Sequence, residues 1–267
     1  MDITTISPSK IRLLQLCGEA FRRKYVEGQR SWYGTAAAIG IATHKSAEND
    51  LNCKVDEGIL LPDEAIADYA ADSFELIWDT EDIELTKAEK EDKFGVHDKS
   101  KDQVIKLAEL HHKDLAPLIR PKVVEKRLEL DVEGFPLTLV GYADVIEEDN
   151  TIRDLKTRGK TPKATDAQDD IGLQFYSVIQ DVNGERPKEL ALDVLVKTKT
   201  PKRVTVTSPT QRDHDATLGR IERAALIIQS GAYMPAEPTH WKCSEKFCEF
   251  FDDCRWGRRR LKQFESA

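Results

Sequence analysis

Two acidic residues and a lysine stand in a segment of this sequence that is otherwise apolar. Residues 140–146 are typical of one strand and residues 151–157 of the next, and these strands carry Asp144, Asp154 and Lys156. Because side chains alternate along a strand, Asp154 and Lys156 point to the same face of the sheet. If a three-residue loop joins the strands, Asp144 lies directly across from Asp154. Such pairs are roughly 4.5–5.5 Å apart at Cβ.

These three side chains have the parts for metal-assisted hydrolysis of a phosphodiester. Two carboxylates that close repel each other, and a divalent cation between them removes the conflict. Bound Mg²⁺ or Mn²⁺ would neutralise phosphate charge and lower the pKa of a water molecule. Lys156 could orient or deprotonate that water and stabilise developing charge. In a buried hairpin, the unpaired charges would cost several kcal/mol without a bound ion.

A second group of residues with chemical potential is the cysteines. Cys243, Cys248 and Cys254 fall within twelve residues, and Cys17 lies on the apolar stripe of the first predicted helix. Four thiolates suit a [4Fe–4S] cluster, which tolerates uneven spacing and one remote ligand. Zinc remains an alternative, although it prefers closely spaced pairs of cysteines. Either metal would tie the first helix to the tail, and Cys53 would be left over.

The predicted elements indicate an α/β, or mixed α+β, fold in which helices flank a mixed sheet. Helices are expected over residues 7–28, 35–49, 62–78, 100–118, 167–182 and 208–229. Strands are expected over residues 124–132, 135–146, 151–157, 189–197 and 203–207. We expect a single domain over residues 1–267, with a mainly helical part over 1–120, the sheet core over 121–207, and a C-terminal helix and cysteine-rich tail over 208–267.

The helix predicted over residues 35–49 carries a histidine on a face of small residues. Gly40, His44 and Ala47 follow one another at three- and four-residue steps. Small side chains would let this helix approach the sheet closely. His44 would then project into whatever lies below, either as a satisfied core residue or as a ligand.

Composition and charge narrow the class of protein. The net charge of −8 argues against a protein that coats nucleic acid non-specifically, but a basic groove remains compatible with it. Basic residues gather in residues 156–163, 197–203 and 255–262. No run approaches 18 apolar residues, and the first residues lack the pattern of a secretory signal. We therefore expect a cytoplasmic protein with no membrane partner.

Six segments in order along the chain match the motifs of a known nuclease family. They are the opening helix 7–25 with Cys17, Gly40-Ile41-Ala42-Thr43-His44, Val124-Glu125, Gly141-Tyr142-Ala143-Asp144, Asp154-Leu155-Lys156-Thr157, and the cysteine-rich tail from Trp241 to Cys254. The chain resembles the RecB-like branch of the PD-(D/E)XK nucleases. Within this branch, it resembles specifically the iron–sulfur exonucleases found in CRISPR-associated systems, in the C-terminal nuclease of AddB and in phages.

The resemblance implies a restriction-endonuclease-like core and a role for each motif residue. His44, Asp144, Asp154 and the Leu155 carbonyl would bind Mg²⁺ or Mn²⁺, and Lys156 would be catalytic together with these side chains. The cysteine-rich tail and Cys17 would close a [4Fe–4S] site. Residues expected to contact DNA are Glu125, Gln174, Tyr176, Arg158 and Lys160. Gly172 stands where the family carries a glutamine four residues before its tyrosine, and Gln174 or Gln168 could substitute for it.

The expected function is a metal-dependent DNA exonuclease that acts on single-stranded ends and carries a structural [4Fe–4S] cluster. Alternatives are an endonuclease, a subunit that trims prespacers in CRISPR adaptation, and a non-catalytic relative that only binds nucleic acid. Because the sequence has no helicase motifs, any unwinding would come from a helicase or recombination partner. The sequence leaves the oligomeric state open.

Overall fold

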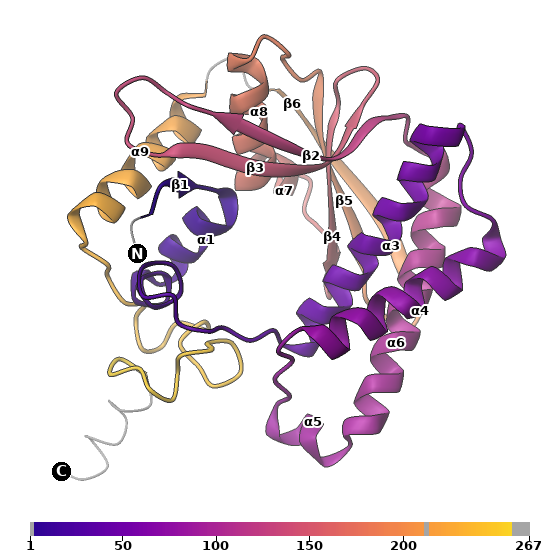
Figure 1. The fold of residues 1–267 in the computed structure, drawn as a ribbon, viewed down its shortest axis with the longest axis horizontal. Helices are drawn as coiled ribbons and strands as arrows, with labels where there is room; N and C mark the ends of the chain where they lie inside the picture. The colour runs from indigo at the N-terminus through magenta and orange to yellow at the C-terminus, as the bar shows by residue number, and fades with distance from the viewer. Residues whose placement is uncertain (1–2, 211–213, 258–267) are drawn as a thin grey trace. The chain divides into compact units, whose positions relative to one another are not determined.

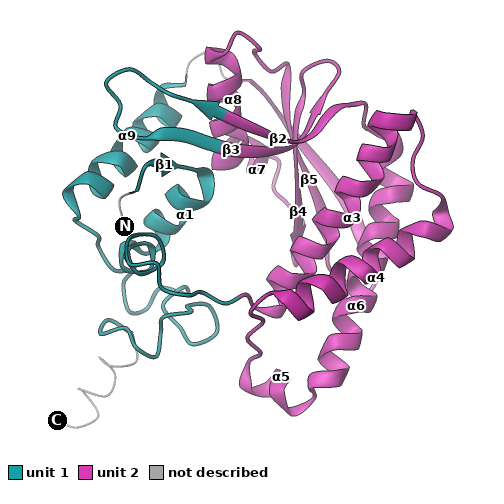
Figure 2. Cartoon of the chain, viewed as in Figure 1, with its two compact units in different colours: residues 1–32, 129–140, 214–267 teal, residues 33–128, 141–213 magenta. Residues whose placement is uncertain are grey.

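The computed structural model describes residues 3–210 and 214–257. Residues 258–262 of the basic segment noted above lie outside these ranges. The fold is a mixed sheet flanked by helices, so the predicted fold class is confirmed (Figure 1). The chain divides into two compact units (Figure 2). Unit 1 comprises residues 1–32, 129–140 and 214–267, and unit 2 comprises residues 33–128 and 141–213.

The sheet has the strand order β1-β3-β4-β5-β6, and β2 also pairs with β3. The β3–β4 and β5–β6 pairs are antiparallel, and the β4–β5 pair is parallel. The strands are β1 (Thr5–Ile6), β2 (Pro121–Leu130), β3 (Thr138–Glu147), β4 (Ile152–Arg158), β5 (Glu189–Val196) and β6 (Lys202–Pro209). The five predicted strands are all present. The short β1 was not predicted.

The hairpin between β3 and β4 has the register that sets the two acids opposite each other. Val145 pairs with Arg153 and Ile146 with Ile152, so the next step along the strands matches Asp144 with Asp154. The Glu147 N–H donates a hydrogen bond to the Thr151 carbonyl at 2.9 Å, so Glu147 and Thr151 close a loop of three residues, Glu148, Asp149 and Asn150. Asn150 closes the loop at φ 63°, in the left-handed region that asparagine tolerates.

Parallel strands need a crossover connection, and helices supply it between β4 and β5. These helices are α7 (Asp166–Asp169) and α8 (Ile171–Val182), and α8 packs against both strands. The single helix predicted over residues 167–182 is therefore wrong. Asp170 leaves the helical conformation (φ −72°, ψ 114°) and its carboxylate accepts hydrogen bonds from the first N–H groups of α8, which makes it the N-cap of that helix.

Three helices of unit 2 pack together beside the sheet. The helical segments are α3 (Thr35–Glu57), α4 (Asp63–Thr80), α5 (Lys87–Glu91) and α6 (Lys93–Leu110), followed by a π-turn over His111–Leu115 and a 3₁₀ turn over Ala116–Leu118. One buried cluster joins α3, α4 and α6 around Phe74 and Val104. A second joins Leu51 of α3 to Leu155 of β4. The predicted end of α3 near residue 49 is wrong: the helix runs on to Gly58, which ends it at φ 77°.

Unit 1 is built from the N-terminal helices, α9 and the tail. Its helices are α1 (Pro8–Leu16), α2 (Gly18–Phe21), a π-turn (Arg22–Val26) and α9 (Asp215–Ser230), and α1 packs against α9. The continuous helix predicted over residues 7–28 is wrong, because Cys17 is extended (φ −166°, ψ 106°) and separates α1 from α2. The start of the last helix at residue 208 is also wrong, since Ser208 and Pro209 end β6.

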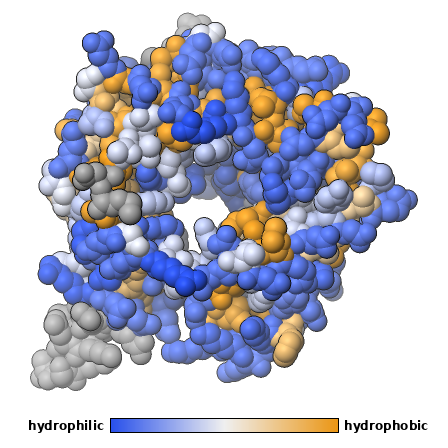
Figure 3. Space-filling model, in the orientation of Figure 1, coloured by the Kyte–Doolittle hydropathy of each residue, from blue (hydrophilic) through white to orange (hydrophobic). Residues whose placement is uncertain are grey.

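In the described part of the chain, no helix is long and apolar enough to cross a membrane. The face drawn in Figure 3 is mostly hydrophilic, with hydrophobic residues in scattered small groups. This surface agrees with the 33% of residues that are charged.

A buried ion pair joins α3 to the short π-helix that follows α6. The Asp50 side chain is 1% exposed, and its Oδ2 lies 2.9 Å from His112 Nδ1. Its Oδ1 accepts a hydrogen bond from the Leu61 N–H at 3.0 Å. Burial alone would lower the pKa of His112, but the hydrogen bonds to Asp50 and Asp63 outweigh it and the pKa is raised. The pair therefore holds the helices of unit 2 at a fixed separation.

We expect Asp50→Ala to lower the free energy of unfolding by about 2–4 kcal/mol, because it leaves the Leu61 N–H and the Nδ1 atom of His112 without a partner in a buried site. Urea unfolding followed by circular dichroism measures this. A group whose folded pKa is raised stabilises most below its unfolded pKa, so the cost should be larger at about pH 6 than at about pH 9. Asp56→Ala, at an exposed position of α3, is the control. Equal effects of the two substitutions would contradict the assigned role of Asp50.

Candidate active site

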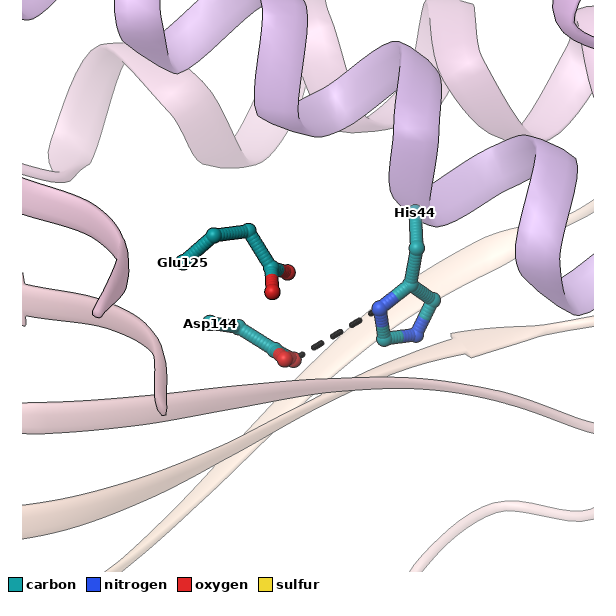
Figure 4. A group of neighbouring side chains, drawn as sticks. All are labelled: His44, Glu125 and Asp144. Atoms are coloured by element: carbon teal, nitrogen blue, oxygen red, sulfur yellow. Dashed lines mark ion pairs between the residues drawn. The ribbon is translucent and has the colours of Figure 1, made fainter. Parts of the chain in front are cut away.

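A close helix–sheet contact positions His44. Gly40 lies against β4, where an added Cβ would be 3.3 Å from Thr157 Oγ1. One turn later along α3, His44 points toward the sheet, and its Nδ1 is 3.6 Å from Asp144 Oδ2 (Figure 4). A side chain at position 40 would require Thr157 or α3 to shift by a few tenths of an ångström. Glycine at this position is thus compatible with the close approach of α3 to β4 that brings His44 to Asp144.

Glu125, from the middle of β2, joins His44 and Asp144, and its backbone has an unusual conformation. Its φ of 51° lies in the left-handed region, which costs a non-glycine residue about 1–2 kcal/mol. Such strain often accompanies a side chain that is redirected for function. One ligand atom from each of the three side chains lies within 4.8 Å of the others (Figure 4). The sequence placed Glu125 among the substrate contacts rather than in this group.

The two acids of the hairpin have different partners. Asp144 Oδ2 accepts a hydrogen bond from the Leu155 N–H at 2.6 Å. Asp154 is buried, and its Oδ2 is 2.5 Å from Lys156 Nζ. The side chains of Asp154 and Lys156 therefore share one face of β4, as the alternation predicts. The ammonium group of Lys156 thus forms an ion pair with the Asp154 carboxylate.

The acids at this site are hard to ionise. Burial, with the charge of Asp144 adding to it, raises the pKa of Asp154 to about 6. Burial and Asp144 likewise raise the pKa of Glu125 to about 7, and burial raises that of Asp144. Burial, together with the ammonium of Lys156, lowers the pKa of His44 to about 4. The histidine is therefore neutral near pH 7, as a metal ligand must be.

Lys156 stays charged in these surroundings. Burial alone would lower its pKa, but the carboxylates of Asp154 and Asp144 outweigh burial and the pKa is raised. The side chain is thus a fixed positive charge beside the acids. A cation in that place can stabilise negative charge that develops on a bound group.

Sequence reasoning missed Asp170, a fourth acid near the site. Its charge contributes to the raised pKa values of both Asp144 and Asp154. A Cβ added at Gly172 would lie 2.9 Å from Asp170 Oδ1 and 3.8 Å from Asp154 Oδ1. Position 172 therefore faces the acids, and the Asp170 carboxylate occupies the space that a side chain there would need. The only signal was an aspartate two residues before a glycine, which is a common helix start.

The other predicted substrate contacts are dispersed. Gln174 is buried, and its Nε2 donates to the Gln168 carbonyl at 3.0 Å. Tyr176 is buried against Gly141, where an added Cβ would be 2.5 Å from the Tyr176 ring. Arg158 pairs with Asp166 at 2.7 Å, and Lys160 is exposed. Gln174 and Tyr176 are thus packed inside unit 2. Arg158 and Lys160 are the members of this group whose side chains reach solvent.

In unit 1, the four predicted cysteine ligands line one small cavity. Cys17, Cys243, Cys248 and Cys254 all face it, whereas Cys53 belongs to unit 2. The tail reaches Cys17 through a close backbone contact. The Gly18 N–H donates to the Met234 carbonyl at 2.7 Å, and an added Cβ at Gly18 would lie 2.7 Å from that oxygen.

The chemistry of this cavity fits a thiolate-bound metal. Burial raises the pKa of Cys248 to about 11, and the charge of Cys17 contributes. A thiol with so high a pKa keeps its proton at neutral pH unless a metal replaces it. Within the described residues, all five cysteines are free of disulfides. Four thiols on one cavity are the donor set of a [4Fe–4S] cluster or of a four-cysteine zinc site.

The donor set in unit 2 fits Mg²⁺ or Mn²⁺. Ligands of Mg²⁺ lie about 2.1 Å from the ion, so two of them can be about 4.2 Å apart across it. The ligand atoms of His44, Glu125 and Asp144 lie within 4.8 Å of one another, so the three side chains are close enough to converge on one ion. Oxygen ligands with one imidazole suit a hard or borderline divalent cation.

Comparison with known proteins gives one family and a similar fold. The model of the PD-(D/E)XK nuclease superfamily matches residues 5–255. No curated protein matches the chain. A crystal structure of a Eubacterium rectale protein described as a candidate exonuclease superposes with a TM-score of 0.51, at 10% identity, over 91% of this chain and 86% of that one. The structure of SSO0001 superposes with a TM-score of only 0.35, at 14% identity, over 88% and 94% of the two chains.

We expect the affinity for Mn²⁺, measured by calorimetry, to rise steeply between about pH 5 and pH 8. Asp154 and Glu125 must lose protons before they bind a cation, and their raised pKa values place this loss near pH 6 and 7. His44, whose pKa is lowered, should contribute nothing to the slope in this range. In Glu125→Gln the part of the slope near pH 7 should disappear. Affinity that does not change with pH would contradict this set of ligands.

Proposed function

This chain belongs to the PD-(D/E)XK nuclease superfamily, and we propose that it is a divalent-metal-dependent deoxyribonuclease that degrades DNA from its ends. One observation carries the proposal: His44, Glu125 and Asp144 lie together beside the ion pair of Asp154 and Lys156. A protein that only bound nucleic acid would have no need to bury acids at this cost.

We assign the metal ligands to His44, Asp144, Asp154 and the Leu155 carbonyl, and we add Glu125. A bound Mg²⁺ or Mn²⁺ would polarise the phosphate and lower the pKa of a water molecule. The side chains of these ligands would set the position of the metal ion. Asp144 is fixed by the Leu155 N–H, and His44 projects from α3 one turn after Gly40, where the helix runs close to Thr157.

Lys156 is assigned the role of charge stabilisation. Its raised pKa keeps it protonated, so it can neutralise the negative charge that builds on the phosphate during attack. A protonated lysine is a poor general base. The proton of the attacking water would then pass to a group other than Lys156.

An exonuclease acting on single-stranded ends is favoured over an endonuclease by the motif pattern of the iron–sulfur branch. The Eubacterium rectale structure, described as a candidate exonuclease, supports the same choice. A subunit that trims prespacers in CRISPR adaptation would also need an end-directed nuclease. Any unwinding of duplex DNA would come from a partner such as a helicase. We propose that the whole chain acts as one nuclease domain.

The cysteine cavity of unit 1 is proposed to hold a structural [4Fe–4S] cluster, with zinc as the alternative. The four cysteines come from both ends of the chain, so a bound metal would fasten the tail to the turn between α1 and α2. We propose a cytoplasmic location, because thiols persist there and disulfides form mainly in oxidising compartments.

With end-labelled single-stranded, duplex and circular DNA in Mg²⁺ or Mn²⁺, we expect degradation of the linear single strand. Asp154→Ala and Lys156→Met should each lower kcat by roughly 100-fold or more, since they remove a metal ligand and the charge that faces the phosphate. Lys156→Met should still bind Mn²⁺.

The matched control for this assay is Glu148→Gln, an exposed acid in the hairpin loop, which should leave kcat unchanged. Cleavage of circular DNA would identify an endonuclease. A wild-type rate retained by Asp154→Ala would refute the enzyme assignment altogether.

Protein purified without oxygen should be brown, with broad visible absorbance and about four iron atoms per chain. A zinc site would be colourless, because Zn²⁺ has a filled d shell. Cys17→Ser and Cys254→Ser should each lose the metal and lower the melting temperature, whereas Cys53→Ser should do neither. Metal content that is independent of Cys17 would show that the tail binds a metal by itself.

A further inference from the structure

Two large aromatic side chains lie exposed side by side on unit 1. Trp241 is 56% exposed and Phe247 is 44% exposed. Their rings contact each other edge to face, with centroids 5.2 Å apart and planes at 85°. Aromatic residues of this size are usually buried, because each offers 150–250 Å² of mostly apolar surface. An exposed pair therefore suggests a surface that receives another flat ring.

Positive charges accompany these rings. Lys246 Nζ lies 5.3 Å from the Phe247 centroid. The Arg255 guanidinium lies 4.3 Å from the centroid of Trp256, a third exposed aromatic residue. In the sequence, Arg255 is followed closely by Arg258, Arg259 and Arg260. Aromatic faces interleaved with cations are the combination that binds single-stranded nucleic acid, in which bases stack and phosphates pair with the cations.

The segment that carries the rings is held by its own hydrogen bonds. Ser244 Oγ donates to the Trp241 carbonyl at 2.8 Å, and the Phe247 N–H donates to the Ser244 carbonyl at 3.1 Å. Lys242 Nζ donates to the Phe247 carbonyl and pairs with Glu249 at 3.1 Å. The rings are thus arranged before any ligand arrives, which lowers the entropy cost of binding.

The cysteine cavity is lined by Trp256 and by Lys242, Cys243 and Cys248 of the segment that carries Trp241 and Phe247. Cys243 follows Trp241 by two residues, and its Sγ lies 3.8 Å from the Trp256 carbonyl oxygen. Cys243 and Trp256 both line the cavity. A metal held by the cysteines would therefore fix the Trp241–Phe247 pair and Trp256 relative to each other.

We propose that Trp241 and Phe247 form a stacking platform for the bases of single-stranded DNA, with Lys246, beside Phe247, placed to contact its phosphates. The occupant is single-stranded because the faces of bases in a duplex are covered by their neighbours. This inference rests on the proposed function and adds to it a substrate-binding surface on unit 1, which contains none of the proposed catalytic residues.

The test uses the full-length holoprotein in an Asp154→Asn background, so that the probe survives. Fluorescence anisotropy with a labelled oligothymidylate of about 20 nucleotides measures binding. Trp241→Ala and Phe247→Ala should each weaken binding about fivefold or more, and Lys246→Gln should weaken it less and reduce its salt dependence. Trp241→Tyr should bind nearly as well as the parent. Binding to a blunt duplex of equal length should change little.

The matched control is Phe94→Ala, which removes an aromatic side chain that is 85% exposed on unit 2 and should leave binding unchanged. Metal content and circular dichroism show whether each variant is folded. If Trp241→Ala does not fold, Phe247→Ala and Lys246→Gln decide the question.

Parental affinity in folded Trp241→Ala and Phe247→Ala would overturn the proposal, as would a dimer in solution that Trp241→Ala dissociates. These outcomes are separate from a failure of the proposed function. If the protein has no nuclease activity but its oligothymidylate binding still depends on Trp241, the stacking platform is supported and the proposed enzymatic function is refuted. If the protein is an active nuclease but binds oligothymidylate equally well after either ring is removed, the enzymatic function is supported and the stacking platform is refuted.

Discussion

The structure of unit 2 depends on the burial of several carboxylates at one end of the β3–β4 hairpin. Asp144 and Asp154 face each other across two paired strands, and Asp170 adds its charge from the start of α8. Burial and the neighbouring carboxylates raise the pKa values of Asp144 and Asp154, because the ionised carboxylates repel one another. Lys156 relieves part of it, and a divalent cation would relieve more. The arrangement stores electrostatic repulsion that metal binding can use.

Two local features of the backbone are explained by this cluster. Gly40 lets α3 approach β4, and Glu125 takes a left-handed conformation within β2. Each disfavours regular structure where it occurs, because glycine weakens a helix and a positive φ strains a strand. Together they bring an imidazole and a third carboxylate to Asp144. The cost is offset by packing elsewhere in unit 2, where α3, α4 and α6 share a buried cluster.

The tail of unit 1 is held in place by different interactions. Its tail from Gly231 onward has turns but no helix or strand in the described residues, so few backbone hydrogen bonds of regular structure hold it. The cysteine cavity and the contact between Gly18 and Met234 fasten it to the N-terminal helices. A metal in that cavity would supply the stability that a small core lacks. The same fastening presents Trp241 and Phe247 at the surface.

The sequence alone determined the hairpin, because strand alternation and a three-residue loop are local and place Asp144 opposite Asp154 without reference to the rest of the chain. It also indicated the four cysteines, since three of them are close in sequence. Only the tertiary structure brought Glu125 to His44 and made Asp170 a neighbour of Asp154. The position of Glu125 accompanies one unusual backbone angle within β2, and that of Asp170 follows from the helix break between α7 and α8. Their neighbours at the site come from elements far apart in sequence, which is why the sequence pattern did not reveal them.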